Sequence, residues 1–277
     1  MAELSALFGK DLAVRTVSGL ALGAAALGLA YVGATPFTAL VLVVAEVLTW
    51  EWARVVRGGA IDAIMIVHGL VVAAAVVATH LGAPAIAILV VGIGAALAGI
   101  MAYGSTSRLS SIGVLYVGLP AVALVAFRSD PVWGFLAVLL LFICVWGTDI
   151  AAYFVGRAVG GPKLWPRISP NKTWSGLIGG VGASALGAAA LSHFVPGASM
   201  ARLALTGLML GIIAQLGDLA ESALKRKRGV KDASDLIPGH GGFLDRVDGL
   251  VLAAVVAAAV AILINVHAPA RALLLWR

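Results

Sequence analysis

The sequence predicts an all-α polytopic membrane protein with about nine transmembrane helices. Of the 277 residues, 61% are hydrophobic and only 12% are charged, whereas a soluble domain is about 45–50% apolar and roughly 25% charged. The apolar runs are too long and continuous for the strands of a membrane barrel. The 34 glycines suit the close packing of helices in a bilayer. A water-solvated fold could not hide this much apolar surface.

Apolar windows of about 17–25 residues mark the expected spans. Pro84 and Pro131 fall at breaks between windows, where a missing backbone N–H costs little. Lys10 and Arg15 precede the first window as they would in a signal peptide. That window is long enough to span and further spans follow, so we expect it to be retained. The windows are 16–33, 36–53, 63–80, 84–103, 112–127, 132–156, 176–195, 203–221 and 249–267.

Basic residues are divided unequally between the segments that join these windows. With a cytoplasmic N-terminus, fifteen of the nineteen Lys and Arg residues lie on the cytoplasmic side and four lie outside. The positive-inside rule therefore predicts a multi-pass protein of the cell membrane with its N-terminus inside and its C-terminus outside. The same orientation places the two long polar loops, 157–175 and 222–248, in the cytoplasm.

The chain divides into two regions on this basis. Residues 1–130 are expected to form N-terminal transmembrane helices that serve as a lipid-facing scaffold, and residues 131–277 carry both polar loops. The net charge of +6 could indicate nucleic acid, but the basic residues flank membrane spans, which favours membrane lipids or phosphate substrates instead. Cys144 has no second cysteine to pair with, so we interpret it as a packing residue.

The first polar loop follows a span that carries Asp149. A carboxylate inside the membrane is costly, so we expect Asp149 to face the site rather than only to pack against a helix. The stretch ISPNKTWSG places Ser169, Lys172 and Thr173 just before a helix, where two hydroxyls and an ammonium could cradle a phosphate. Two ordinary interpretations stay open: Ser169 could begin a turn with Pro170, and Thr173 could cap the helix.

The second polar loop lies between two pairs of acids. Asp218 and Glu221 are three residues apart on one expected helix, and Asp245 and Asp248 are three apart on the next, so each pair shares a face. Carboxylates gathered at one end of a bundle suit Mg²⁺, which takes one or two of them together with substrate phosphates. Basic residues of the same segment suit the phosphates themselves: Lys225, Arg226 and Lys231.

Glycines of the second loop favour close approach to a ligand. The run PGHGG at 238–242 permits tight turns but lacks the pattern of a Walker loop. His240 within it either orders the turn or handles phosphate or a proton. The basic run at 225–228 alone would indicate a positive-inside anchor, which explains neither the paired acids nor the glycine turn. Acids for a metal beside bases for phosphate are typical of nucleotide chemistry.

These residues resemble a known family. The segment SALKRKRGVKDASDLIPGHGGFLDRVD at 222–248 is similar to the signature of the phosphatidate cytidylyltransferases, also called CDP-diglyceride synthases, and ISPNKTWSG resembles their second motif. Many members carry an acidic or amide residue where Ser175 stands, so we assign it no role. The matching positions are Ser222, Lys225, Arg226, Lys231, Asp232, Ser234, Pro238, His240, Gly241, Gly242, Asp245, Arg246 and Asp248, with Ser169, Pro170, Lys172, Thr173 and Gly176 upstream.

The resemblance implies an enzyme with its active site at the cytoplasmic end of the C-terminal helices. It would transfer CMP from CTP to phosphatidic acid with Mg²⁺ as cofactor, as a homodimer in which residues 1–130 provide the scaffold. The expected catalytic residues are Asp218, Asp245, Asp248, Lys172 and His240; the expected substrate-binding residues are Ser169, Lys172, Thr173, Lys225, Arg226, Lys231, Gly241, Gly242 and Arg246; the expected metal ligands are Asp218, Asp245, Asp248 and Asp149.

Two other functions fit parts of the pattern. A CTP-dependent lipid kinase would phosphorylate an alcohol and release CDP. A secondary transporter of phosphorylated solutes would also use buried acids and glycine-rich helices. For the acids alone there is a structural alternative, in which they only pair with Lys225, Arg226 or Arg246.

Overall fold

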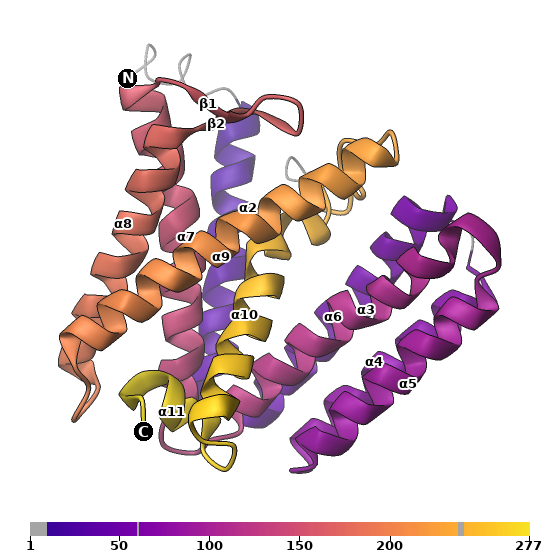
Figure 1. Cartoon of the computed structure of the whole chain (residues 1–277), viewed down its shortest axis with the longest axis horizontal. Helices are drawn as coiled ribbons and strands as arrows, with labels where there is room; N and C mark the ends of the chain where they lie inside the picture. Colours follow the sequence, from indigo (N-terminus) through magenta and orange to yellow (C-terminus); the bar gives the residue numbers. More distant parts are fainter. Residues whose placement is uncertain (1–9, 60, 238–240) are drawn as a thin grey trace.

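The computed structural model describes residues 10–59, 61–237 and 241–277, and shows a bundle of long helices with one short hairpin at an end (Figure 1). Within these residues, seven helical segments are long and apolar enough to cross a membrane. The polytopic helical prediction is therefore confirmed, while the count of nine spans is not. The seven are Ala63–His80, Pro84–Met101, Ser107–Arg128, Gly134–Val159, Trp174–Phe194, Met200–Lys227 and Leu244–Ile264.

Helices also occupy the first two apolar windows, so each window corresponds to one helix. Figure 1 shows α2 beginning at the end of the bundle that carries the hairpin, whereas α11 lies at the opposite end. The α-helices are α2 (Lys10–Val32), α3 (Ala34–Arg57), α4 (Ala63–His80), α5 (Pro84–Met101), α6 (Ser107–Arg128), α7 (Gly134–Val159), α8 (Trp174–Leu191), α9 (Met200–Lys227), α10 (Leu244–Ile264) and α11 (Pro269–Leu275).

The first polar loop corrects the all-α prediction. Its residues form two antiparallel strands, β1 (Lys163–Trp165) and β2 (Ser169–Thr173), in which Lys163 pairs with Thr173. Prolines at 162, 166 and 170 disfavour a helix here, because proline lacks the N–H that a helix interior needs. The expected phosphate cradle is thus a strand that leads into α8.

The two helices that carry the paired acids extend beyond the apolar windows at the ends where those acids lie. Helix α9 continues to Lys227, and α10 begins at Leu244 rather than at 249. Both predicted acid pairs consequently lie on regular helix, as their three-residue spacing requires. Helix α10 ends at Ile264, and the buried short helix α11 follows.

Small residues bring α7 and α8 into close contact below the hairpin. A Cβ on Gly176 would lie 2.8 Å from the carbonyl oxygen of Ala152, and one on Gly180 would lie 2.6 Å from that of Thr148. Neither position tolerates a side chain, which is the small-residue contact typical of membrane helices. This packing fixes β2 beside the part of α7 that carries Asp149.

Candidate active site

Helix α9 supplies the centre of the site. Asp218, Glu221 and Lys225 recur at three and four residues, so they lie along one face of its last turns. Strand β2 brings Lys172 to one end of this face, and α10 brings Asp245 to the other. The result is two lysine–aspartate ion pairs in a row, the first of which joins the hairpin to α9.

The pair nearer the hairpin joins Lys172 to Asp218 and is partly exposed. The Lys172 ammonium contacts the Asp218 carboxylate and also donates to Gln215 Oε1 at 3.1 Å. The amide of Gln215 donates in turn to Asp149 Oδ1 at 3.1 Å. Asp218 additionally accepts from the Ser222 hydroxyl at 3.3 Å. Asp149 is thereby linked to the site through Gln215.

The second pair joins Lys225 to Asp245 and is more deeply enclosed. Lys225 Nζ lies 2.8 Å from Glu221 Oε2 and also contacts Asp245 Oδ1. The other oxygen of Asp245 accepts from the backbone N–H groups of Ala233 at 3.1 Å and Gly242 at 2.8 Å. Asp245 therefore ties the second polar loop to the start of α10.

Asp248 lies one turn further along α10, where α9 and α10 approach closely. A Cβ on Gly217 would lie 2.7 Å from the carbonyl oxygen of Asp248. The Oδ1 atom of Asp248 accepts from the Gly249 N–H at 2.7 Å. Asp248 thus lies where α10 packs against α9, the helix that carries Asp218.

Comparison with known proteins assigns a family to this arrangement. The profile of the cytidylyltransferase family matches residues 13–264. The chain belongs to the cytidylyltransferase family.

Relatives of this cytidylyltransferase come from several bacteria. The phosphatidate cytidylyltransferases of Brucella suis and Brucella abortus are each 39% identical to it over 249 residues, which cover 88% of this chain and 91% of the relative. That of Bacillus subtilis is 40% identical over 143 residues, or 51% of this chain and 53% of the relative. The similarity to the Brucella proteins therefore extends through nearly the whole chain.

Some residues of the cytidylyltransferase motifs have local structural roles. Thr173 Oγ1 accepts from the Gly176 N–H at 3.1 Å, so the helix-capping interpretation of Thr173 is confirmed. Ser169 pairs with Trp165 in the hairpin. Arg226 is exposed and donates to the Val230 carbonyl at 3.4 Å.

The glycine turn is described only from Gly241 onward, and His240 lies outside the described residues. Gly241 has a φ of 78°, which favours glycine, and its carbonyl oxygen accepts from the Ile237 N–H at 2.9 Å. A Cβ on Gly242 would lie 2.4 Å from Glu51 Oε1. The two glycines make room for carboxylates of the protein itself. Lys231 and Arg246 are both exposed.

Sequence reasoning missed two polar residues of the site. Gln215 bridges Lys172 and Asp149, and Glu51 of α3 accepts hydrogen bonds from the second polar loop. Glu51 lies in the apolar window 36–53, so the argument that singled out Asp149, the cost of a carboxylate in a membrane span, would have found it. Gln215 carries no such signal.

The fit of a divalent cation rests on the chemistry of the donors. Among the described residues, no group of three or more His, Cys, Asp or Glu side chains is already arranged to hold a metal ion. In part, the acids pair with lysines as the structural alternative expects, because Asp245 contacts Lys225. Asp218 pairs instead with Lys172. The aspartate oxygens are nevertheless the hard ligands that Mg²⁺ prefers.

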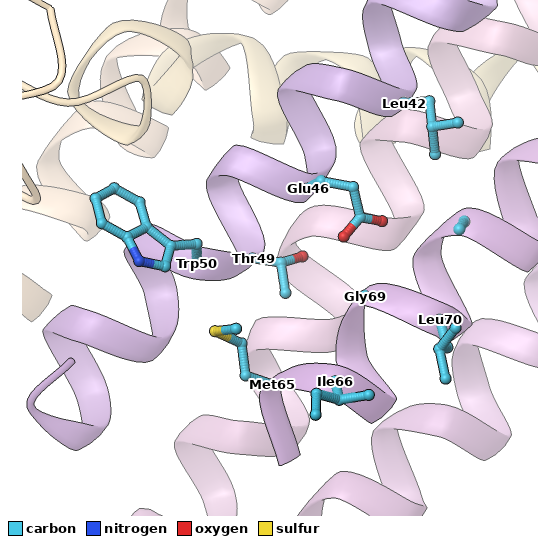
Figure 2. A pocket seen from close by; sticks show the side chains of 9 residues that line it. Leu42, Glu46, Thr49, Trp50, Met65, Ile66, Gly69 and Leu70 are labelled. Atoms are coloured by element: carbon cyan, nitrogen blue, oxygen red, sulfur yellow. The ribbon is translucent and has the colours of Figure 1, made fainter. Parts of the chain in front are cut away.

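A pocket of about 350 Å³ lies elsewhere, between α3 and α4 (Figure 2). Its lining includes Glu46, whose Oε2 occupies the space that a Cβ on Gly69 would need. None of the lining residues is basic, so the pocket lacks the cations that a triphosphate requires. The lining residues are Leu42, Glu46, Thr49, Trp50, Met65, Ile66, Gly69, Leu70 and Ala73.

Proposed function

We propose that this chain transfers CMP from CTP to phosphatidic acid, giving CDP-diacylglycerol and pyrophosphate. The observation that carries the proposal is the extent of the family match, which spans residues 13–264. The match includes every residue of the acid–base cluster, which consists of Asp149, Lys172, Asp218, Glu221, Lys225, Asp245 and Asp248. The cluster has the composition that such a reaction needs. Acids lie beside lysines along it, and the lysines can meet phosphate oxygens while the lipid tails stay in the bilayer.

The reaction is an in-line displacement at phosphorus. A phosphate oxygen of phosphatidic acid forms a bond to the α-phosphorus of CTP, and the bond from that phosphorus to the bridging oxygen of pyrophosphate breaks. The attacking oxygen is already an anion, so no strong general base is needed. Catalysis then consists of positioning and of charge neutralisation around the triphosphate.

Within this scheme the lysines bind phosphate. Lys172 is partly exposed beside Asp218, so its ammonium can turn to a phosphate oxygen without crossing the protein interior. Lys225 is enclosed by Glu221 and Asp245 and supplies a fixed positive charge behind the site. Further phosphate contacts are proposed from Ser169, Arg226, Lys231 and Arg246, and from the glycine turn that contains His240.

Mg²⁺ is the proposed cofactor. The carboxylates of Asp218, Asp245, Asp248 and Asp149 would hold it, and when bound it supplies positive charge opposite the triphosphate. The proposal is supported by the carboxylate groups that α7, α9 and α10 contribute to this part of the bundle.

One assay tests the reaction against its alternatives. Detergent-purified protein is given CTP, phosphatidic acid and Mg²⁺, and pyrophosphate and CDP-diacylglycerol are followed together. We expect both products in equal amounts. Release of CDP with an alcohol acceptor would indicate a lipid kinase instead, and turnover of neither substrate would favour transport.

The orientation of the chain is also a proposal. We place the N-terminus and the cluster in the cytoplasm and the C-terminus outside, supported by the unequal distribution of basic residues. In a Cys144→Ala background, Ser199→Cys should react with a membrane-impermeant thiol reagent on intact cells, and Lys227→Cys should not. Both chosen positions are exposed. The reverse result would show that the active site lies on the outer side of the membrane.

The oligomeric state is proposed to be a homodimer, with residues 1–130 as the scaffold. The protein mass in detergent, measured by light scattering, should correspond to two chains. A mass of one chain would contradict the proposal without affecting the reaction.

A further inference from the structure

Glu51 is a fully buried carboxylate in the N-terminal region of the chain. It lies near the end of α3, with an exposed fraction of 0%. Its Oε1 accepts from the Ser234 hydroxyl at 2.5 Å and from the Phe243 N–H at 3.0 Å, and its Oε2 accepts from the Leu244 N–H at 2.6 Å. All three donors belong to the second polar loop or to the first residue of α10.

Two carboxylates divide the amides at the start of α10 between them. The N–H of Gly242 goes to Asp245 at 2.8 Å, and the next two, of Phe243 and Leu244, go to Glu51. The first amides of a helix have no partner within the helix, and negative charge is favoured there. The start of α10, and with it Asp245, is thus held by a residue from the other end of the sequence.

The local sequence is adapted to this contact. A Cβ on Gly242 would lie 2.4 Å from Glu51 Oε1 and 2.8 Å from the Glu51 carboxyl carbon. A side chain at 242 would therefore displace the carboxylate. Ser234 is itself buried at 5% exposure, and its oxygen also accepts from the Leu236 N–H at 3.2 Å. The loop is thus fastened to Glu51 at two places, at Ser234 and at the start of α10.

We propose that Glu51 is a positioning residue of the transferase site, and this inference rests on the proposed function. The hydrogen bonds of its carboxylate go to Ser234, Phe243 and Leu244. By fixing Ser234, Phe243 and Leu244, it sets the place of the Asp245 carboxylate against Lys225. A catalytic contribution therefore comes from the region predicted to be a scaffold.

The test compares the turnover of the Glu51→Gln variant with that of the unaltered protein. Glutamine keeps the shape and one oxygen but turns an NH₂ group toward the Leu244 N–H, so one bond is replaced by two facing donors. Loss of a residue that orients a site ligand typically lowers activity by about 10–100-fold. We expect a decrease of this size in kcat, with little change in the KM for CTP. Ser234→Ala removes a different bond and should lower kcat less.

Glu46→Gln is the matched control. Glu46 lies five residues earlier on α3, and its carboxylate points into the pocket between α3 and α4 rather than toward α10 (Figure 2). The Glu46→Gln substitution removes one carboxylate from α3, as Glu51→Gln does, and should leave kcat unchanged. A purely structural cap at Glu51 predicts a lower unfolding temperature but an unchanged kcat in protein that is still folded.

Each outcome decides one question. No turnover by the unaltered protein would overturn the proposed function. Turnover by the unaltered protein together with an unchanged kcat for folded Glu51→Gln would overturn the positioning role alone. If Glu51→Gln does not fold, Ser234→Ala decides, because an unchanged kcat for that folded variant would also overturn the positioning role.

Discussion

The two ion pairs on α9 have the same chemistry but different surroundings. In the Lys172–Asp218 pair, the side chains are 20% and 25% exposed, and the further partners are side chains. In the Lys225–Asp245 pair, the exposures are 10% and 7%, and Asp245 also holds two backbone amides. The first pair can exchange its partners for substrate groups, whereas the second pair cannot do so without loosening the loop around it.

This difference in exposure predicts different effects on turnover and on stability when the two pairs are substituted. Removing one partner of a buried pair leaves an uncompensated charge or donor and costs about 3–5 kcal/mol, while exposed pairs contribute about 0–1 kcal/mol. A substitution in the partly exposed pair should therefore act on turnover, and one in the enclosed pair should act on both turnover and stability.

Asp245→Asn should have the largest total effect. Asparagine keeps one oxygen, so its NH₂ group must face either Lys225 or the amides of Ala233 and Gly242. We expect a loss of about 3–5 kcal/mol of stability, together with a fall in turnover of at least about 100-fold. Thermal unfolding in detergent and CDP-diacylglycerol formation measure the two effects. A variant with normal thermal stability would contradict the view that the Lys225–Asp245 pair holds the second polar loop in place.

Asp218→Asn should lower turnover almost as much while leaving the protein folded. The pair with Lys172 is partly exposed, so its loss should change stability by no more than about 1 kcal/mol. Loss of a transition-state electrostatic contact lowers turnover by roughly 100–1,000-fold, and the proposed Mg²⁺ would lose a ligand as well. Activity is measured across a series of Mg²⁺ concentrations. Near-normal Mg²⁺-dependent turnover would remove Asp218 from the proposed ligands.

Lys172→Ala should weaken the use of substrate. A hydrogen bond to a charged group contributes about 1.5–3 kcal/mol, so kcat/KM for CTP or phosphatidic acid should fall by roughly 10–100-fold. Lys225→Ala is the comparison, because it leaves Glu221 and Asp245 buried without their ammonium and should lower the unfolding temperature too. Equal thermal stability of the two variants would contradict the view that the enclosed pair contributes more to stability than the partly exposed pair.

The helices and the acid pairs follow from local sequence. Long apolar windows locate spans because the bilayer requires about 20 apolar residues, and the three-residue spacing of Asp218 and Glu221 places them on one face wherever a helix forms. The hairpin was not predicted, because two short strands in a proline-rich loop give almost no periodic signal.

Contacts between distant segments are what sequence alone could not give. The bond from Ser234 to Glu51 joins residues 183 positions apart, and the one from Lys172 to Gln215 joins residues 43 apart. Each depends on how helices pack, which no spacing within one segment encodes. Residue type alone indicated Asp149 as a candidate site residue, because a carboxylate in a membrane span is rare.

Glu221→Gln should have the smallest effect and so marks the edge of the site. Glu221 lies beside Lys225 at 2.8 Å, but Asp245 contacts the same ammonium, so the lysine keeps a charged partner when Glu221 is neutralised. Two carboxylates share one ammonium in this group, and removing one negative charge relieves their repulsion while losing one ion pair. These opposing effects should leave stability within about 1 kcal/mol of its starting value.

Turnover of Glu221→Gln should fall by less than that of Asp218→Asn, since Glu221 faces Lys225 rather than Lys172. The two variants are compared in one preparation for thermal stability and Mg²⁺-dependent turnover. A loss of turnover in folded Glu221→Gln as large as that in Asp218→Asn would show that the enclosed pair, too, takes part directly in the chemistry.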